Sequence, residues 1–216
     1  MLMKYTKSLF LALSIILFIG CSSKDAVKEY DKPALYWYKN IIKNVAISNF
    51  DKADNYYISL KSEHMRSPLL PTATLILAQA HIKDQSYIMA DYYLDEYLKK
   101  YASGEKIELA KFLKIKAAFL GLKDINRDQK LMLDTIKNVD KFTKDYPNSI
   151  YRPLVDTLKV RLYMAQYLLN DNIARLYKRI GKIKAYKIYM EKNKKSVLNS
   201  ADIRPPKESL FDKLFK

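Results

Sequence analysis

The sequence predicts an all-α protein, an α-solenoid of about four helix pairs with one long helix in the fourth. Three observations support this fold class. Apolar residues recur at helical spacing from residue 33 to about residue 194. The 216 residues include only four glycines, too few for a turn-rich β architecture. A pattern of one small and two large residues also returns along the chain.

Polar residues, glycine or proline separate the predicted helices. We expect breaks at residues 48–49, 68–71, 84–86, 103–104, 121–126, 146–149 and 181. Pro33 suits the first turn of the first helix. The expected buried face of that helix consists of Leu35, Tyr38, Ile42, Val45 and Ala46.

The second helix of each pair carries the repeated pattern. Its copies are Ala53-x3-Tyr57-x2-Leu60, Ala90-x3-Leu94-x2-Tyr97, Thr135-x3-Val139-x2-Phe142 and a weaker one at Ala185-x3-Tyr189. A small residue one turn before two large ones lets neighbouring helices approach closely. The copies lie 37, 45 and 50 residues apart. They resemble tetratricopeptide-type helix pairs, whose usual period is ~34 residues.

The fourth unit predicts one continuous helix of about 28 residues, ~42 Å long. Its apolar stripe is Leu154, Leu158, Leu162, Ala165, Leu169, Ile173, Leu176 and Ile180. Gly181 is expected to end this helix, and a short basic helix should follow to about Lys192.

The residues before the helices predict export and a lipid anchor. A basic start, an apolar stretch from Ser8 to Ile19, and Gly20 before Cys21 are typical of a lipoprotein signal peptide over residues 1–20. Cys21, the only cysteine, is then the lipidation site. Residues 21–32 are interpreted as a tether and 33–194 as the helical domain. An ordinary secretory signal or a buried free thiol is the alternative.

Residues 195–216 are expected to form a flexible tail that ends in a short amphipathic peptide. Leu210, Phe211, Leu214 and Phe215 would share one face of a two-turn helix. A helix this short does not hold alone in water. We interpret it as a peptide that docks on a partner or a membrane. The alternative is that it caps the last helix of the array.

The formal charge of +16 is concentrated late in the chain. Residues 151–216 carry 16 basic and 6 acidic side chains. The expected partner-binding residues are Arg175, Lys178, Arg179, Lys182, Lys184 and Lys187. In an exported lipoprotein their anionic partners would be lipid head groups or acidic protein surfaces, and no nucleic acid. General lysine richness is the alternative explanation.

No pattern in the sequence indicates catalysis, a metal site or a cofactor. His64 and His81 are the only histidines, and they fall on or near different predicted helices. Four aromatic residues near the start of the array, Tyr36, Trp37, Tyr56 and Tyr57, could line a concave substrate groove. Core packing is the alternative role for each of them.

The later motifs resemble the BamD family of lipoproteins, also called YfiO-type. The resemblance rests on residues 126–128, on Val139-Asp140-Lys141-Phe142, on Asp145-Tyr146-Pro147-Asn148-Ser149, and on the long-helix end at residues 174–181. It covers roughly residues 33–193. A lipobox-like segment at Phe18-Ile19-Gly20-Cys21 precedes them.

Membership would imply a scaffold without enzymatic activity, lipid-anchored at the periplasmic face of the outer membrane. Its partners would be a BamA-like barrel subunit, gripped by the C-terminal half, and unfolded outer-membrane proteins, received by the first repeats. Family members commonly have five repeats, whereas the repeat pattern here fades after the fourth. A pilotin-type repeat lipoprotein for secretin or pilus assembly, or an accessory of cell-wall metabolism, is the alternative.

Overall fold

The computed structural model describes residues 29–196 and 198, and every regular element in this part of the chain is an α-helix. The eight helices are α2 (Ala34–Ala46), α3 (Phe50–Glu63), α4 (Leu69–Lys83), α5 (Tyr87–Lys100), α6 (Glu105–Leu120), α7 (Gln129–Asp145), α8 (Arg152–Arg179) and α9 (Ile183–Lys194). Neighbouring helices pack as pairs, which confirms the predicted all-α solenoid. None of the described helices is long and apolar enough to cross a membrane.

Most of the predicted breaks coincide with the observed helix ends. The break expected at residues 68–71 was partly wrong, because α3 ends at Glu63 and α4 already begins at Leu69. Ser48, Gln85, Gly104 and Gly181 each adopt a positive φ between two helices. Gly181, at φ 74°, turns the chain from α8 into α9. Glycine adopts this left-handed backbone without steric cost, which is why it suits this turn.

The chain divides into two compact units, one up to Leu70 and one from Pro71 onward. In the first unit, α2 packs against α3. The buried residues of α2 are Trp37, Ile41 and Asn44. The predicted face was wrong for this helix, because Leu35 is 51% exposed and Ala46 is also exposed. The tryptophan ring, the largest apolar group in α2, takes the inward position.

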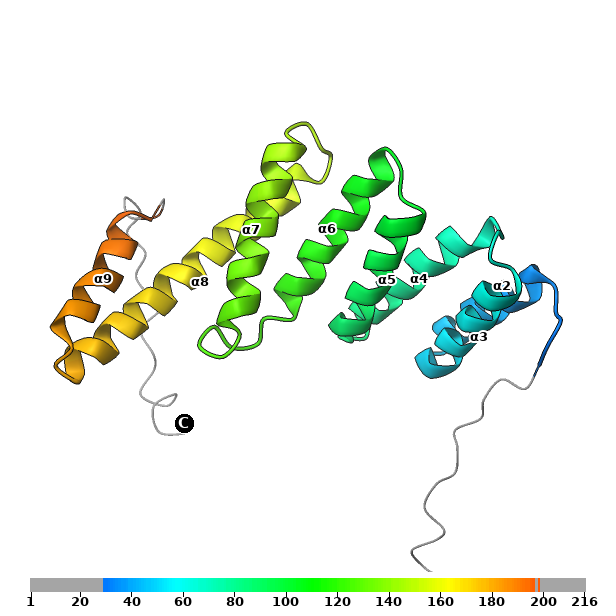
Figure 1. Cartoon of the computed structure of the whole chain (residues 1–216), viewed down its shortest axis with the longest axis horizontal. Coiled ribbons are helices and arrows are strands. Elements are labelled where there is room, and N and C mark those ends of the chain that lie inside the picture. Colours follow the sequence, from blue (N-terminus) through cyan, green and yellow to red (C-terminus); the bar gives the residue numbers. More distant parts are fainter. Residues whose placement is uncertain (1–28, 197, 199–216) are drawn as a thin grey trace, which may run out of the picture. The chain divides into compact units, whose positions relative to one another are not determined.

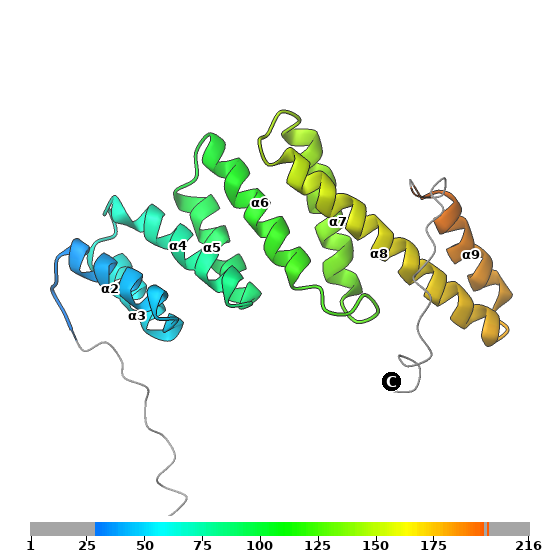
Figure 2. The same ribbon diagram turned by 180° about the vertical axis from the view of Figure 1, so that it is seen from behind.

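In the second unit, α6 lies between α5 and α7 in both views of the ribbon (Figures 1 and 2). His81 of α4 stacks on Tyr93 of α5, with ring centroids 5.5 Å apart. Helix α9 folds back along the later part of α8 (Figure 1). Helix α8 has 28 residues, as the apolar stripe predicted.

The repeated pattern marks the core of each of the first three copies. Its small residues Ala53, Ala90 and Thr135 are all buried, and so are the two large residues of each copy. The buried Thr135 hydroxyl donates a hydrogen bond of 2.6 Å to the Leu131 carbonyl, which satisfies its polar group. In the weaker fourth copy, Ala185 and Tyr189 are half-buried.

The predicted limits of the signal, tether, helical domain and tail stay predictions. Cys21 lies outside the described residues, and so do Leu210, Phe211, Leu214 and Phe215.

Candidate partner-binding surface

The hairpin of α8 and α9 carries the predicted basic residues, and a buried asparagine fastens its two helices together. Asn193 of α9 is 4% exposed. Its amide nitrogen donates to the Tyr167 carbonyl at 3.0 Å, and its amide oxygen accepts from Asn170 Nδ2 at 3.0 Å. Because both bonds reach α8, they fix how α9 lies against that helix.

The six predicted basic residues are all exposed and follow the chain around the α8–α9 turn. Arg175 and Arg179 are one turn apart on α8, so they share a face. Lys184 and Lys187 are similarly spaced on α9. Arg175 pairs with Asp171 at 2.8 Å, the one carboxylate that pairs with this basic group among the described residues. Residues 172–190 contain no acidic side chain at all.

Exposed aliphatic side chains lie among these cations, and two of them belong to the predicted apolar stripe. Leu176 and Ile180, the last two residues of the predicted apolar stripe, are 44% and 52% exposed. Ile183 and Ile188 of α9 are exposed as well. Helix α9 packs along this end of α8, where the Tyr177 and Tyr189 ring centroids lie 5.8 Å apart, but it leaves Leu176 and Ile180 exposed. We call residues 175–188 the basic tip.

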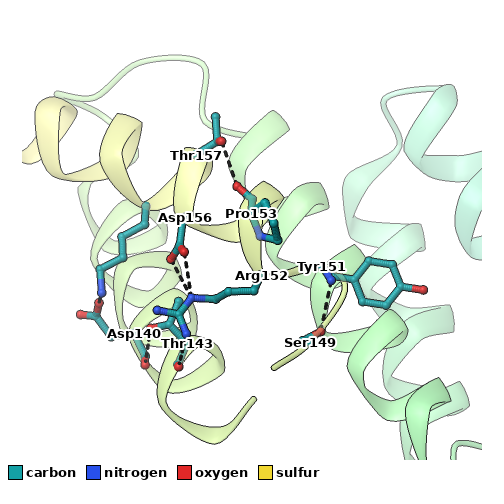
Figure 3. A network of polar contacts seen from close by, with 9 residues as sticks. Asp140, Thr143, Ser149, Tyr151, Arg152, Pro153, Asp156 and Thr157 are labelled. Atoms are coloured by element: carbon teal, nitrogen blue, oxygen red, sulfur yellow. Dashed lines mark hydrogen bonds and ion pairs between the residues drawn. The ribbon is translucent and has the colours of Figure 1, made fainter. Parts of the chain in front are cut away.

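Figure 3 shows the contacts that anchor the start of α8 on α7. Arg152 Nε donates to both carboxylate oxygens of Asp156 at 2.9 Å, and its Nη1 donates to the Thr143 carbonyl at 2.9 Å. Asp140 of α7 pairs with Lys159 at 2.8 Å. These contacts fix the orientation of the first turns of α8 relative to α7.

Tyr163 adds a further tie between the same two helices. Its hydroxyl donates to Asp140 Oδ2 at 2.7 Å. Burial, together with this hydrogen bond to a carboxylate, raises the pKa of Tyr163 to about 12. The phenol therefore remains a hydrogen-bond donor well above neutral pH.

The Tyr-Pro-Asn-Ser segment and Tyr151, which connect α7 to α8, also contact α6. The Tyr146 hydroxyl accepts from Lys111 Nζ at 2.8 Å, and the Tyr151 ring stacks on Phe112 with centroids 5.1 Å apart. Ser149 is buried, and its hydroxyl accepts from the Tyr151 amide at 3.2 Å. The most specific motif of the sequence thus has a structural role here.

A groove of about 550 Å³ opens between α7, α8 and α9, and sequence reasoning missed it. Leu133, Tyr163, Tyr167, Ile173 and Tyr189 supply apolar or aromatic surface. Lys192, whose ammonium lies 4.4 Å from the Tyr189 ring centroid, and Lys195 add positive charge. We call it the α7–α9 groove. The half-buried tyrosines were the signal that could have indicated it.

A smaller pocket of about 230 Å³ lies where α6 and α7 meet the end of α5. Lys111 and Lys114 are on its wall. Lys114 pairs with Asp91 at 3.1 Å and donates a hydrogen bond to Asp95. Burial acts to lower the pKa of Lys114, but the two carboxylates outweigh it and the pKa is raised.

The four aromatic residues of the predicted substrate groove divide into two groups. Trp37 and Tyr57 are 0% and 1% exposed, so they belong to the core and do not present a surface. Trp37 donates to Glu63 at 2.9 Å. Tyr36 and Tyr56 are half-buried. The Tyr36 hydroxyl donates to Glu29, which raises the pKa of Tyr36. Their role toward a substrate stays a prediction.

The two histidines lie in different surroundings. His64, at the end of α3, contacts the Lys32 carbonyl through Nε2 at 2.6 Å, whereas His81 is buried in α4. The described residues include no cluster of three or more potential metal ligands.

The fold and its exposed tip define a helical-repeat protein of stacked helix pairs, an architecture that presents extended binding surfaces. A family model described as YfiO, outer membrane lipoprotein, matches residues 30–192. The chain is also 38% identical over 195 residues to the outer membrane protein assembly factor BamD of Helicobacter pylori, which covers 89% of each chain. The chain therefore belongs to the YfiO family of outer membrane lipoproteins, of the BamD type.

Proposed function

We propose that this chain is a scaffold without turnover that helps fold and insert outer-membrane proteins. The family and the assembly factor from Helicobacter pylori support this role, and they do not favour the pilotin or cell-wall alternatives. The predicted lipid at Cys21 would hold the scaffold at the periplasmic face of the outer membrane. Tethering confines weak contacts to one surface, where they act at high local concentration.

The basic tip is the surface we assign to a BamA-like barrel subunit. The single observation that carries this assignment is the cluster of exposed cations and exposed aliphatic residues on one rigid hairpin. Cations steer an acidic partner toward the surface, and the aliphatic side chains give it apolar area to bury. Arginine guanidinium groups can also bind carboxylates through two parallel hydrogen bonds.

Co-purification tests this function. A tagged full-length chain should recover a BamA-like subunit in mild detergent, and the double variant Arg175→Glu/Arg179→Glu should recover much less. The double variant Lys39→Glu/Lys43→Glu is a matched control, because these exposed lysines have the same spacing near the end of α2. Equal recovery by both variants would remove the basic tip from the proposal. Recovery of no barrel subunit by the unaltered chain would count against the function itself.

The receipt of unfolded substrate by the first helix pair is a separate part of the proposal. Tyr36 and Tyr56 support it, because each keeps part of its aromatic ring accessible. Aromatic faces suit an extended peptide with alternating apolar side chains. Cross-linking from position 56 to a nascent barrel protein should succeed, whereas cross-linking from the buried position 57 should not.

A further inference from the structure

The α7–α9 groove is a largely apolar surface beside the last residues that the structure describes. Lys195 and Ser196 line the groove themselves, and the described chain ends at Leu198. The described chain therefore ends near the rim of the groove. We propose that the segment 208–215 of the same chain docks in the α7–α9 groove and covers it.

The lengths agree with this occupant. Eleven residues lie between Leu198 and Leu210, and the twelve residue-to-residue steps of an extended chain reach ~40 Å. The groove follows α8 from Tyr163 to Ile173, which is ~15 Å of helix. A helix over residues 208–215 would be ~12 Å long. The connecting chain is thus long enough to reach any point of the groove, and the docked segment matches its length.

The chemistry of the two surfaces is complementary. On a helix, Leu210, Phe211, Leu214 and Phe215 form one apolar face. Glu208 and Asp212 lie one turn apart beside the phenylalanine edge of that face. The groove offers Leu133, which is 40% exposed, and three tyrosines for the apolar face, with Lys192 and Lys195 for the two carboxylates.

The segment and the groove belong to the same chain, so even a weak contact between them is effective. A segment joined by a short linker acts at a millimolar effective concentration, so modest affinity suffices to keep the groove occupied. A two-turn helix does not hold alone in water, and the groove supplies the apolar contact it lacks. This inference concerns the groove and does not depend on which partner binds the basic tip.

A labelled peptide of residues 205–216 provides the test. It is titrated into the full-length chain and into a full-length variant that carries Leu210→Ser, Phe211→Ser, Leu214→Ser and Phe215→Ser. The peptide should bind the serine variant and should bind the unaltered chain at least tenfold more weakly, because the chain's own segment competes. Equal binding to both chains, or no binding to the serine variant, would overturn the proposal.

Two charge variants of the serine chain locate the contact. Lys192→Glu/Lys195→Glu should weaken peptide binding at least threefold. Lys184→Glu/Lys187→Glu has the same spacing along the chain but lies outside the groove, near the start of α9, and it should leave binding unchanged. If Lys184→Glu/Lys187→Glu weakened peptide binding and Lys192→Glu/Lys195→Glu did not, the segment would bind the basic tip and the proposal would be overturned. Light scattering on the unaltered chain should show a monomer at every concentration, and a dimer lost with the serine changes would also overturn it.

Discussion

Removing the Asn193 side chain should loosen α9 from α8. Asn193→Ala removes two hydrogen bonds and leaves the Tyr167 carbonyl and the Asn170 amide without those partners. Each buried polar group left unsatisfied costs about 1–3 kcal/mol. Alanine regains about 0.5 kcal/mol through its better helix propensity. Because Tyr167 and Asn170 are only half-buried, the low end of that range applies to each, and the expected net loss is about 2 kcal/mol.

Hydrogen–deuterium exchange measures this loss where it occurs. Because each 1.4 kcal/mol corresponds to a factor of ten, amide protection in α9 should fall about 30-fold. Protection in α5 and α6 should stay unchanged, because α9 does not pack against them. Asn172→Ala is the matched control, since Asn172 is exposed on α8, and its effect should stay within about 0.5 kcal/mol. A fall of less than threefold in α9 would refute the role given to Asn193.

Three further changes test other parts of the account. Ala90→Leu inserts a large side chain at a fully buried position of the repeated pattern, so it should destabilise the chain by about 1–3 kcal/mol. Urea denaturation measures this change, and an unchanged midpoint would contradict the packing role of the small residue. The free energy of unfolding should fall as the pH rises from 10 to 12. Because the pKa of Tyr163 is raised to about 12 in the folded protein, the protonated phenol stabilises the fold at pH values below the unfolded pKa, and this contribution is lost as the folded phenol ionises. Tyr163→Phe should flatten this fall, and identical pH profiles of the two proteins would count against it. Cys21→Ala should leave helix content unchanged in circular dichroism and shift the protein out of the membrane fraction, whereas retention in that fraction would exclude the lipid anchor.

The helix pattern could be predicted from the sequence because its breaks are local. Proline in the 146–149 segment and glycine at 104 and 181 are unfavourable in a helix interior, and each lies between two observed helices. The three full copies of the repeated pattern are buried because their spacing by itself defines one face of a helix.

Which side of α2 is buried could not be predicted, because this helix carries apolar or aromatic residues on more than one side. Trp37 and Ile41 face inward, while Leu35 remains 51% exposed. Asn193 gives no apolar signal at all, and only its two partners on α8 explain its burial. The exposure of Leu176 and Ile180 depends on how α9 packs against α8, which the stripe on α8 does not encode. The α7–α9 groove likewise depends on three helices that meet in space.

The affinity of the full-length chain for the periplasmic part of a BamA-like subunit tests the central claim most directly. The account predicts that Arg175→Glu/Arg179→Glu weakens binding at least tenfold at low salt, while Lys39→Glu/Lys43→Glu leaves it within twofold. It also predicts that binding weakens with rising salt, because exposed charges are screened within ~10 Å at 0.1 M. Binding of the arginine double variant within twofold of the unaltered chain, at every salt concentration, would contradict the claim that the basic tip binds the barrel subunit.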